Sequence, residues 1–249
     1  MPAMPWLEGL SGRRVVVTGA GRGIGRACAI GLAAAGAEVT AVARTAADLD
    51  TLAAASDGRI TAWCADVTTD AFVARLEAVG QLDVLVNNAG MNCPLPIASV
   101  ATATLDAMLA LNVRATYRAS QAAARVMLRS GCAGSIIHMS SQMGHVGAAL
   151  RTVYCMTKHA VEGLTKAMAV ELGPAGIRVN SVAPTFIETD LTRTMFEDAA
   201  FRKSVLESIP LGRLGTLADV VGAVLFLASP ASAMITGTSL RVDGGWTAR

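Results

Sequence analysis

Short runs rich in β-branched residues alternate along this chain with longer stretches rich in alanine and leucine. Near-continuous apolar runs of this kind are typical of strands buried on both faces of a parallel sheet, and the longer stretches suit the helices that connect such strands. The expected strands are residues 13–18, 38–43, 60–65, 83–87, 135–140, 177–182 and 239–243. The expected helices are residues 24–35, 46–55, 69–79, 104–129, 152–172 and 217–227. The alternation predicts an α/β fold: a doubly wound parallel sheet in a three-layer α/β/α arrangement.

The pattern continues without a linker, a composition break or an internal repeat, so residues 1–249 are predicted to form a single domain. Segment 184–210 is where the alternation is interrupted. Long connections in compact domains tend to carry function, and we therefore expect this segment to be a cap over a binding site.

Composition excludes several classes of protein. The chain is 53% hydrophobic with a mean hydropathy of +0.48, but no stretch approaches the roughly 20 consecutive apolar residues of a transmembrane helix. Residues 1–12 lack the basic and apolar regions of a secretory signal. Lysine and arginine are dispersed at a net charge of +2, unlike in a nucleic-acid binder, and the five cysteines are not at metal-ligand spacing. We expect a cytoplasmic protein without a membrane, nucleic-acid or metal partner.

A glycine-rich turn, TGAGRGIG at residues 18–25, joins the first expected strand to the first expected helix. Glycines permit unusual backbone angles and a close approach of the chain to a ligand, and a helix N-terminus attracts a diphosphate. The spacing of Gly19, Gly23 and Gly25 differs from the common GxGxxG fingerprint, so a plain tight turn is the alternative. The position at the first βα crossover favours dinucleotide binding in a Rossmann-type domain.

The second expected strand ends at Ala43 and Arg44, where an NAD-binding domain usually carries an acid for the ribose. The guanidinium of Arg44 could pair with a 2′-phosphate, and Arg22 in the glycine turn could assist. Solvated loop charges are the alternative for both arginines. NADP(H) is therefore favoured, and NAD(H) stays open.

Two further strand ends carry candidate cofactor contacts. Asp66 and Val67 could bracket an adenine ring, although Asp66 could instead cap the next helix. Asn88, Ala89 and Gly90 follow the fourth expected strand, at the sheet edge where ligands bind. The side chain of Asn88 could contact the cofactor or satisfy backbone groups between strands.

Tyr154 and Lys158 stand four residues apart in an expected helix and therefore share one helix face. A lysine cation near a phenol lowers the pKa of the phenol, which suits proton transfer. Ser141 ends the fifth expected strand and could bind a carbonyl oxygen; Ser140 is the neighbouring alternative, but adjacent strand residues point in opposite directions. Asn112 is a polar residue in an apolar helix and could hold a water chain.

These motifs together resemble the short-chain dehydrogenases/reductases, over residues 10–245. The resemblance rests on TGAGRGIG, Asp66, NNAG at 87–90, Asn112, Ser141, YCMTK at 154–158 and ITGTSLRVDGG at 235–245. It implies a catalytic tetrad of Asn112, Ser141, Tyr154 and Lys158. In that tetrad Tyr154 transfers the proton, Ser141 stabilises the oxyanion, Lys158 lowers the pKa of Tyr154 and holds the nicotinamide ribose, and Asn112 relays protons through water.

The resemblance also completes the predicted cofactor site. Pro184, Ile187 and Thr189 match family positions near the nicotinamide. The predicted cofactor-binding residues are Gly19, Arg22, Gly23, Ile24, Gly25, Arg44, Asp66, Val67, Asn88, Ala89, Gly90, Tyr154, Lys158, Pro184, Ile187 and Thr189.

Within the family the sequence is most similar to the dicarbonyl/L-xylulose reductases and related tetrameric carbonyl reductases, for example in GRRVVVTGAGRGIGR at 12–26 and ELGPAGIRVNSVAPT at 171–185. This implies NADP(H)-dependent hydride transfer between the nicotinamide and a carbonyl or secondary alcohol of a small dicarbonyl, ketose or sugar alcohol. It also implies a homotetramer, in which the alanine-rich helices expected at 104–129 and 152–172 form the subunit contact.

The loop before Tyr154 departs from the xylulose reductases, because Leu150 and Arg151 replace polar residues that include a histidine. That departure puts a sugar substrate in doubt. Gln142 could hydrogen-bond a substrate. Arg151 could recognise an anionic substrate, but a surface charge is the favoured interpretation, and His145 is expected to be a solvated loop residue.

Two other functions remain open. A 3-oxoacyl-carrier-protein reductase shares the tetrad and would need a basic docking surface for its acidic carrier. A non-catalytic nucleotide-binding regulator could use the same fold, but a pure binder has no need of the proton donor that Ser141, Tyr154 and Lys158 would form.

Overall fold

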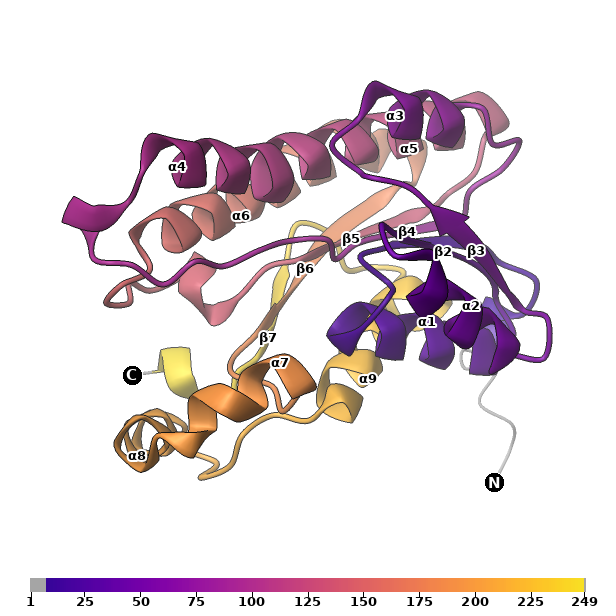
Figure 1. The fold of residues 1–249 in the computed structure, drawn as a ribbon. Coiled ribbons are helices and arrows are strands. Elements are labelled where there is room, and N and C mark those ends of the chain that lie inside the picture. Colours follow the sequence, from indigo (N-terminus) through magenta and orange to yellow (C-terminus); the bar gives the residue numbers. More distant parts are fainter. Residues whose placement is uncertain (1–7, 249) are drawn as a thin grey trace.

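The sheet of this protein has seven parallel strands, in a computed structural model that describes residues 8–248 (Figure 1). The strands are β1 (Arg14–Thr18), β2 (Glu38–Ala43), β3 (Ile60–Cys64), β4 (Val84–Asn87), β5 (Ser135–Met139), β6 (Arg178–Pro184) and β7 (Ser239–Val242). Their order is β3-β2-β1-β4-β5-β6-β7, and every neighbouring pair is parallel. The predicted doubly wound parallel sheet is confirmed, and each strand lies within two residues of its predicted bounds.

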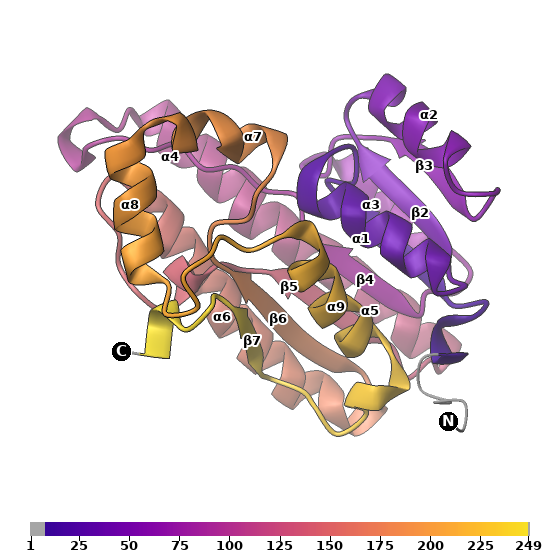
Figure 2. The same ribbon diagram turned by 90° about the horizontal axis from the view of Figure 1, so that it is seen from below.

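Helices cover both faces of the sheet. One layer holds α1 (Gly23–Ala34), α2 (Ala46–Ala54) and α9 (Leu217–Ala228); the other holds α3 (Asp70–Glu77), α4 (Thr102–Leu109), α5 (Thr116–Ser130) and α6 (Thr152–Leu172) (Figures 1 and 2). Val15 and Val17 of β1 join the core under α1 and α9, whereas Val16 joins the core under α3 and α5. Because alternate residues of a strand point to opposite faces, a strand covered on both sides is apolar throughout.

The predicted helix 104–129 is continuous in the structure but consists of three parts: α4, a short turn and α5. Residues Ala110–Ala115 form a π-helical turn between α4 and α5. A π turn adds a residue to the helical repeat and is frequent at functional sites. Asn112 lies in this turn, and its side chain is held by the backbone of Met91.

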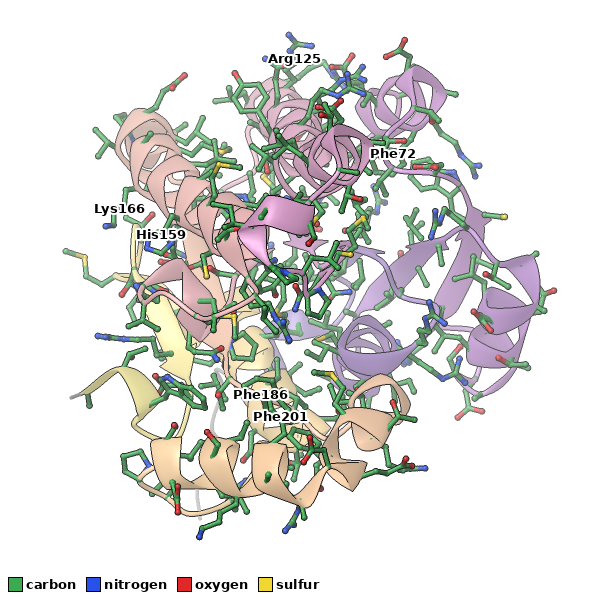
Figure 3. All side chains as sticks on the ribbon, turned by 60° about the vertical axis from the view of Figure 1, so that its left-hand side comes forward. Phe72, Arg125, His159, Lys166, Phe186 and Phe201 are labelled. Carbon is green, nitrogen blue, oxygen red and sulfur yellow. The ribbon has the colours of Figure 1, made fainter. Side chains whose placement is uncertain are left out.

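Segment 184–210 contains two helices that the sequence analysis did not predict, α7 (Asp190–Arg193) and α8 (Ala199–Ser208). Phe186, Phe196 and Phe201 pack here with Trp246 from the C-terminal end against a small buried cluster. Four of the ten aromatic residues of the chain therefore meet in this place. Figure 3 shows Phe186 and Phe201 next to one another where α8 packs on the rest of the chain. The segment thus has its own small apolar cluster beside the sheet.

The topology positions a site between β1 and β4. From these two neighbouring strands the chain passes to opposite faces of the sheet, which creates a crevice at their carboxyl ends. Across residues 8–248, no helix combines the length and the apolar character that crossing a bilayer requires.

Candidate active site

The glycine turn delivers the N-terminus of α1 to the crevice. Helix α1 begins at Gly23, and its N-cap residue Arg22 makes no capping hydrogen bond with its side chain. Its first turn contains no acidic residue. The first amides of a helix have no partner within the helix and carry the positive end of its dipole. This end of α1 therefore offers N–H donors to an anion such as a diphosphate.

Glycine is required in this turn for steric reasons. Gly19 and Gly23 have φ angles of +66° and +56°, in the left-handed region. A Cβ on Gly19 would lie 2.9 Å from the amide nitrogen of Asn88, and a Cβ on Gly25 would collide with the carbonyl oxygen of Gly19. Ile24 is partly buried against the core beneath the turn. Glycine at these positions therefore lets the turn pack closely against Asn88, which follows β4.

Asn88 is the clamp that holds this turn. Its side-chain Nδ2 donates to the carbonyl oxygens of Thr18 and Gly19, both at 3.1 Å. The hydroxyl of Thr18 accepts from the backbone amides of Asn88 and Ala89. Of the two alternatives for Asn88, the structure shows the bonding of backbone groups between strands.

Arg22 and Arg44 are both exposed. Arg22 lies in the glycine turn, and Arg44 directly follows β2. No carboxylate whose side chain the structure describes forms an ion pair with either guanidinium. The Asp48 carboxylate lies 3.3 Å from where a Cβ on Gly21 would be. Helix α2 starts at Ala46, two residues after Arg44, and its N-cap Thr45 makes no side-chain capping bond. This region therefore combines two guanidinium groups with a second helix N-terminus.

Asp66 follows β3 and is held in a local turn. Its Oδ1 accepts from the amide and the hydroxyl of Thr68. These hydrogen bonds, with a smaller contribution from the charge of Arg44, lower the pKa of the Asp66 carboxyl. The alternative that Asp66 caps the next helix is wrong, because the hydroxyl of Thr69 caps α3 by accepting from the amide of Phe72. Val67 is buried beside it.

Ser141 follows β5 and faces the functional cluster. Its hydroxyl donates to the Gln142 side chain at 2.9 Å, accepts from the Met143 amide, and interacts with the phenol of Tyr154. The hydroxyl of Ser140 points elsewhere: it is buried without a hydrogen-bond partner among the described residues, under Gly144. The predicted choice of Ser141 over Ser140 agrees with this geometry. Gln142 is buried and bonded to Ser141.

The side chains of Tyr154 and Lys158 lie one turn apart on α6. The Lys158 ammonium is 5.5 Å from the centre of the Tyr154 ring and donates to the carbonyl oxygen of Met139 at 2.7 Å. It also lies 3.8 Å from where a Cβ on Gly90 would be. A side chain at position 90 would therefore be in van der Waals contact with the ammonium.

The pKa of Tyr154 is shifted upward in this structure, not downward as the sequence suggested. Burial raises the pKa of Tyr154 to about 12, although the interaction with Ser141 and the charge of Arg151 act in the opposite direction. Burial also lowers the pKa of Lys158 to about 8, against the influence of the Glu162 carboxylate. Near neutral pH the phenol is therefore protonated and the ammonium is charged.

Asn112 completes the cluster from the π-helical turn. Its side chain accepts from the Met91 amide at 2.8 Å and donates to the Met91 carbonyl oxygen at 2.8 Å and to the Thr157 hydroxyl at 3.1 Å. Its Oδ1 lies 3.3 Å from where a Cβ on Gly90 would be. Asn112 therefore shares Gly90 as a neighbour with Lys158.

Three predicted residues lie where β6 leads into segment 184–210. Pro184 ends the strand and Ile187 is buried, with its carbonyl oxygen accepting from the Thr192 hydroxyl. Thr189 is the N-cap of α7 and forms a capping box with Thr192. Its methyl group is 4.0 Å from where a Cβ on Gly23 would be, so this segment reaches the glycine turn.

Two residues near the cluster were misjudged from sequence. His145 is partly buried rather than solvated: its Nε2 lies 2.9 Å from the Ser239 hydroxyl and 3.4 Å from the buried carboxylate of Glu162. Arg151 is only 7% exposed, so its interpretation as a surface charge is wrong. Glu162 follows Lys158 by four residues in the same helix. This spacing could have shown that the two side chains are neighbours on one helix face.

A buried histidine behind the site was also missed. His138 of β5 is fully buried, and its two ring nitrogens each lie 2.9 Å from a hydroxyl, of Ser120 on α5 and of Thr165 on α6. Asn87 of β4 donates to the same Ser120 hydroxyl. The network joins two central strands to two helices.

Between about pH 7 and about pH 5, the free energy of unfolding of the wild-type protein is expected to fall. The fall should be about 2 kcal/mol larger than the fall in the variant His138→Gln over the same interval. Burial, followed by the charge of Lys158, lowers the pKa of His138 from 6.5 to about 4. The folded state therefore favours the neutral ring, and this stabilisation is lost as the pH falls below the pKa of the unfolded chain. Urea unfolding at both pH values measures it, with the exposed His159→Gln as the control that keeps the wild-type dependence. Equal dependence in His138→Gln and wild type would refute this.

Within residues 8–248, no group of three histidine, cysteine, aspartate or glutamate side chains is placed to hold a metal ion.

Comparison with known proteins places this arrangement in a family. A family model described as enoyl-(acyl carrier protein) reductase matches residues 19–247. The chain is 46% identical to an L-xylulose reductase of Mesocricetus auratus over 239 residues, which cover 96% of this chain and 98% of that protein.

Two solved structures have the same fold at clear sequence identity. A short-chain type dehydrogenase/reductase from Mycobacterium marinum matches with a TM-score of 0.90 at 37% identity, covering 98% of each chain. A gluconate 5-dehydrogenase from Burkholderia cenocepacia J2315, in complex with NADP and tartrate, matches with a TM-score of 0.91 at 36% identity, covering 98% of this chain and 99% of that chain. The chain therefore belongs to the short-chain dehydrogenase/reductase family of oxidoreductases.

Proposed function

We propose that this protein reduces a carbonyl group of a small polar substrate with NADPH, and oxidises the corresponding alcohol in reverse. The observation that carries the proposal is the convergence of Ser141, Tyr154 and Lys158, with the Lys158 ammonium next to Gly90 after the end of β4. When bound, the nicotinamide supplies or accepts the hydride.

The residues of the chain would orient the substrate and move a proton. The Ser141 hydroxyl would hydrogen-bond the carbonyl oxygen and stabilise the negative charge that develops on it. The Tyr154 hydroxyl would donate its proton to the same oxygen. The Lys158 ammonium would stabilise the negative charge that remains on the Tyr154 oxygen. Asn112 would fix the backbone of Met91 through its two hydrogen bonds.

The titration of the cluster favours reduction near neutral pH. A proton donor must carry its proton, and burial keeps the pKa of Tyr154 at about 12. Lys158, with its pKa lowered to about 8 by burial, is largely charged in the same range.

The glycine turn and the start of α1 support a dinucleotide. Gly19, Gly23 and Gly25 would allow the chain to approach the cofactor closely, and the first amides of α1 would donate to its diphosphate. Asp66, Val67, Ala89 and Gly90 would line the adenosine and ribose side, while Pro184, Ile187 and Thr189 would meet the nicotinamide. The buried hydroxyl of Thr185, which has no partner among residues 8–248, is a further polar atom at this end.

The choice of NADP(H) over NAD(H) rests on Arg44, Arg22 and the start of α2. Both guanidinium groups lack an ion-pair partner among the described residues, and Thr45 leaves the N-terminus of α2 uncapped by a side chain. These donors suit a 2′-phosphate. The solved gluconate 5-dehydrogenase with bound NADP supports the same choice.

Arg44→Asp is expected to lower kcat/KM for NADPH by about 100-fold while changing kcat/KM for NADH by less than about threefold. The substitution removes charge-assisted hydrogen bonds and adds a like charge beside the phosphate. Steady-state kinetics with each cofactor measures the effect, and Arg59→Asp, at the opposite end of the sheet, is the control. A retained preference for NADPH would refute the role of Arg44.

The substrate class is inferred from the relatives. The similarity to an L-xylulose reductase and a gluconate 5-dehydrogenase supports a ketose or a sugar acid. The sequence resemblance to the dicarbonyl/L-xylulose reductases adds a dicarbonyl. Oxidation of NADPH should be followed with diketone, ketose, aldehyde and acetoacetyl-thioester panels at fixed protein concentration. We expect turnover with diketones or ketoses. Turnover of the thioester alone would indicate a carrier-protein reductase, and tight NADPH binding without any turnover would indicate a regulator.

The protein is expected to be a homotetramer at micromolar concentration. Helices α5 and α6 expose apolar side chains that would be covered between subunits, including Tyr117 at 50% and Val170 at 81% exposure. Sedimentation velocity measures the oligomeric state, and Val170→Asp should shift it towards smaller species. A monomer in the wild type would contradict this expectation.

A further inference from the structure

A buried arginine lies beside the proposed proton donor. Arg151 is the N-cap residue of α6, three residues before Tyr154, and is 7% exposed. Its charge reaches the phenol of Tyr154 and the thiols of Cys155 and Cys93. Cys93 belongs to the segment after β4, so Arg151 lies between that segment and the first turn of α6.

The guanidinium of Arg151 is poorly satisfied by the protein. Its Nη1 donates to the Leu150 carbonyl oxygen at a long 3.4 Å, and its Nε has no hydrogen-bond partner in the part of the chain that the structure describes. Among the side chains that the structure describes, no carboxylate forms an ion pair with it. Buried charges in proteins are normally paired, because taking them out of water is costly. A partner is therefore missing from the protein itself.

The backbone holds Arg151 firmly in this place. Leu150 has a φ of +61°, which is strained for a leucine, and its carbonyl oxygen accepts from the Leu95 amide at 3.0 Å. The Arg151 amide donates to Ala148, and its carbonyl oxygen accepts from Cys155 in the first turn of α6. The side chain thus starts from a fixed position, at the loop where the sequence departs from the xylulose reductases.

We propose that Arg151 binds a carboxylate of the substrate, so that the preferred substrates are oxo acids and the corresponding hydroxy acids. This inference rests on the proposed reductase function and specifies its substrate. An arginine fork binds both oxygens of a carboxylate and would satisfy the unpaired Nε. The anionic groups of the cofactor are expected at the glycine turn and Arg44, whereas Arg151 adjoins the proton donor.

The same geometry limits the length of the substrate. The charge of Arg151 acts on the Tyr154 phenol, so the guanidinium and the phenol face groups that are close together. The carboxylate is therefore expected only a few carbon atoms from the reacting carbonyl. Arg151 would be a specificity-determining residue, since the proton is given by Tyr154.

The test compares carboxylates with their near-isosteric amides: acetoacetate with acetoacetamide, and levulinate with levulinamide. In the wild-type protein with NADPH, kcat/KM for the better carboxylate should exceed that for its amide by about 10- to 100-fold. In Arg151→Met this ratio should fall to about one or below, and Arg151→Lys should retain part of it because the charge remains without the fork. Arg59→Met removes an exposed positive charge far from the site and should keep the wild-type ratio.

A wild-type ratio at or below one for both pairs, or an unchanged ratio in Arg151→Met, would overturn the inference. If Arg151→Met does not fold, as judged by thermal unfolding, the wild-type ratio and Arg151→Lys decide. Diacetyl, a neutral diketone, distinguishes a failure of the role of Arg151 from a failure of the proposed reductase function. Reduction of diacetyl without a carboxylate preference refutes the role of Arg151 alone, whereas no reduction of any of these compounds refutes the proposed reductase function as well.

Discussion

Replacing Tyr154 with phenylalanine is expected to lower kcat for carbonyl reduction by about 10³-fold, while the Kd for NADPH changes by less than about threefold. The substitution removes one oxygen atom and keeps the ring that packs near Lys158. In the proposed reaction that oxygen carries the transferred proton, and burial keeps it protonated over the whole neutral range. Single-turnover kinetics separates the loss of chemistry from any loss of binding.

The chain offers a matched control, because Tyr117 is its other tyrosine. Tyr117 is 50% exposed on α5, and Tyr117→Phe should keep kcat within about twofold of the wild type. Retention of more than about a tenth of wild-type kcat in Tyr154→Phe would show that another group supplies the proton.

Lys158→Met is expected to lower kcat/KM for reduction by about 10²- to 10³-fold and to remove a pH dependence that the wild type shows above neutrality. Burial lowers the pKa of Lys158 to about 8, so the ammonium loses its charge as the pH rises through that value. Reduction by the wild type should therefore decline above about pH 8. A pH profile of kcat/KM from neutral to alkaline conditions measures this decline.

Two further variants make the test specific. Lys166 lies on the outer side of α6 and is exposed, so Lys166→Met should keep both the rate and the pH profile (Figure 3). Glu162 raises the pKa of Lys158, so Glu162→Gln should move the decline to lower pH. An alkaline decline that is the same in Lys158→Met and in the wild type would assign it to a different group.

The sheet was predictable because its strands are buried on both faces. Val15 and Val17 pack into the core on one face of the sheet, and Val16 packs into the core on the other face. The strand is therefore an unbroken apolar run, which can be recognised in the sequence. The place of the site followed from the same pattern, since parallel strands bring their carboxyl ends to one edge.

Features that depend on contacts distant in sequence were not predictable. The aromatic cluster under α8 needs Trp246, which joins Phe186 and Phe201 only in the folded chain. The π turn at Asn112 has no local residue signature and is fixed by Met91 and Thr157. A pattern of residue types could not show these partners.

Burial was the other quantity that the sequence concealed. The spacing of Tyr154 and Lys158 correctly placed them together, but the pKa of the phenol depends on how much water reaches it, and burial dominates. Arg151 was misjudged for the same reason, because a charged residue in a loop is usually exposed.

Hydride transfer from the cofactor to a carbonyl carbon is the central claim, and an isotope measures it most directly. NADPH carrying deuterium at the transferring position of the nicotinamide should be incubated with the protein and diacetyl or levulinate, and the product analysed by mass spectrometry. One alcohol should form for each NADPH oxidised, with the deuterium on the new carbinol carbon. NADPH that binds but yields no deuterated alcohol with any carbonyl compound of the panel would contradict this claim.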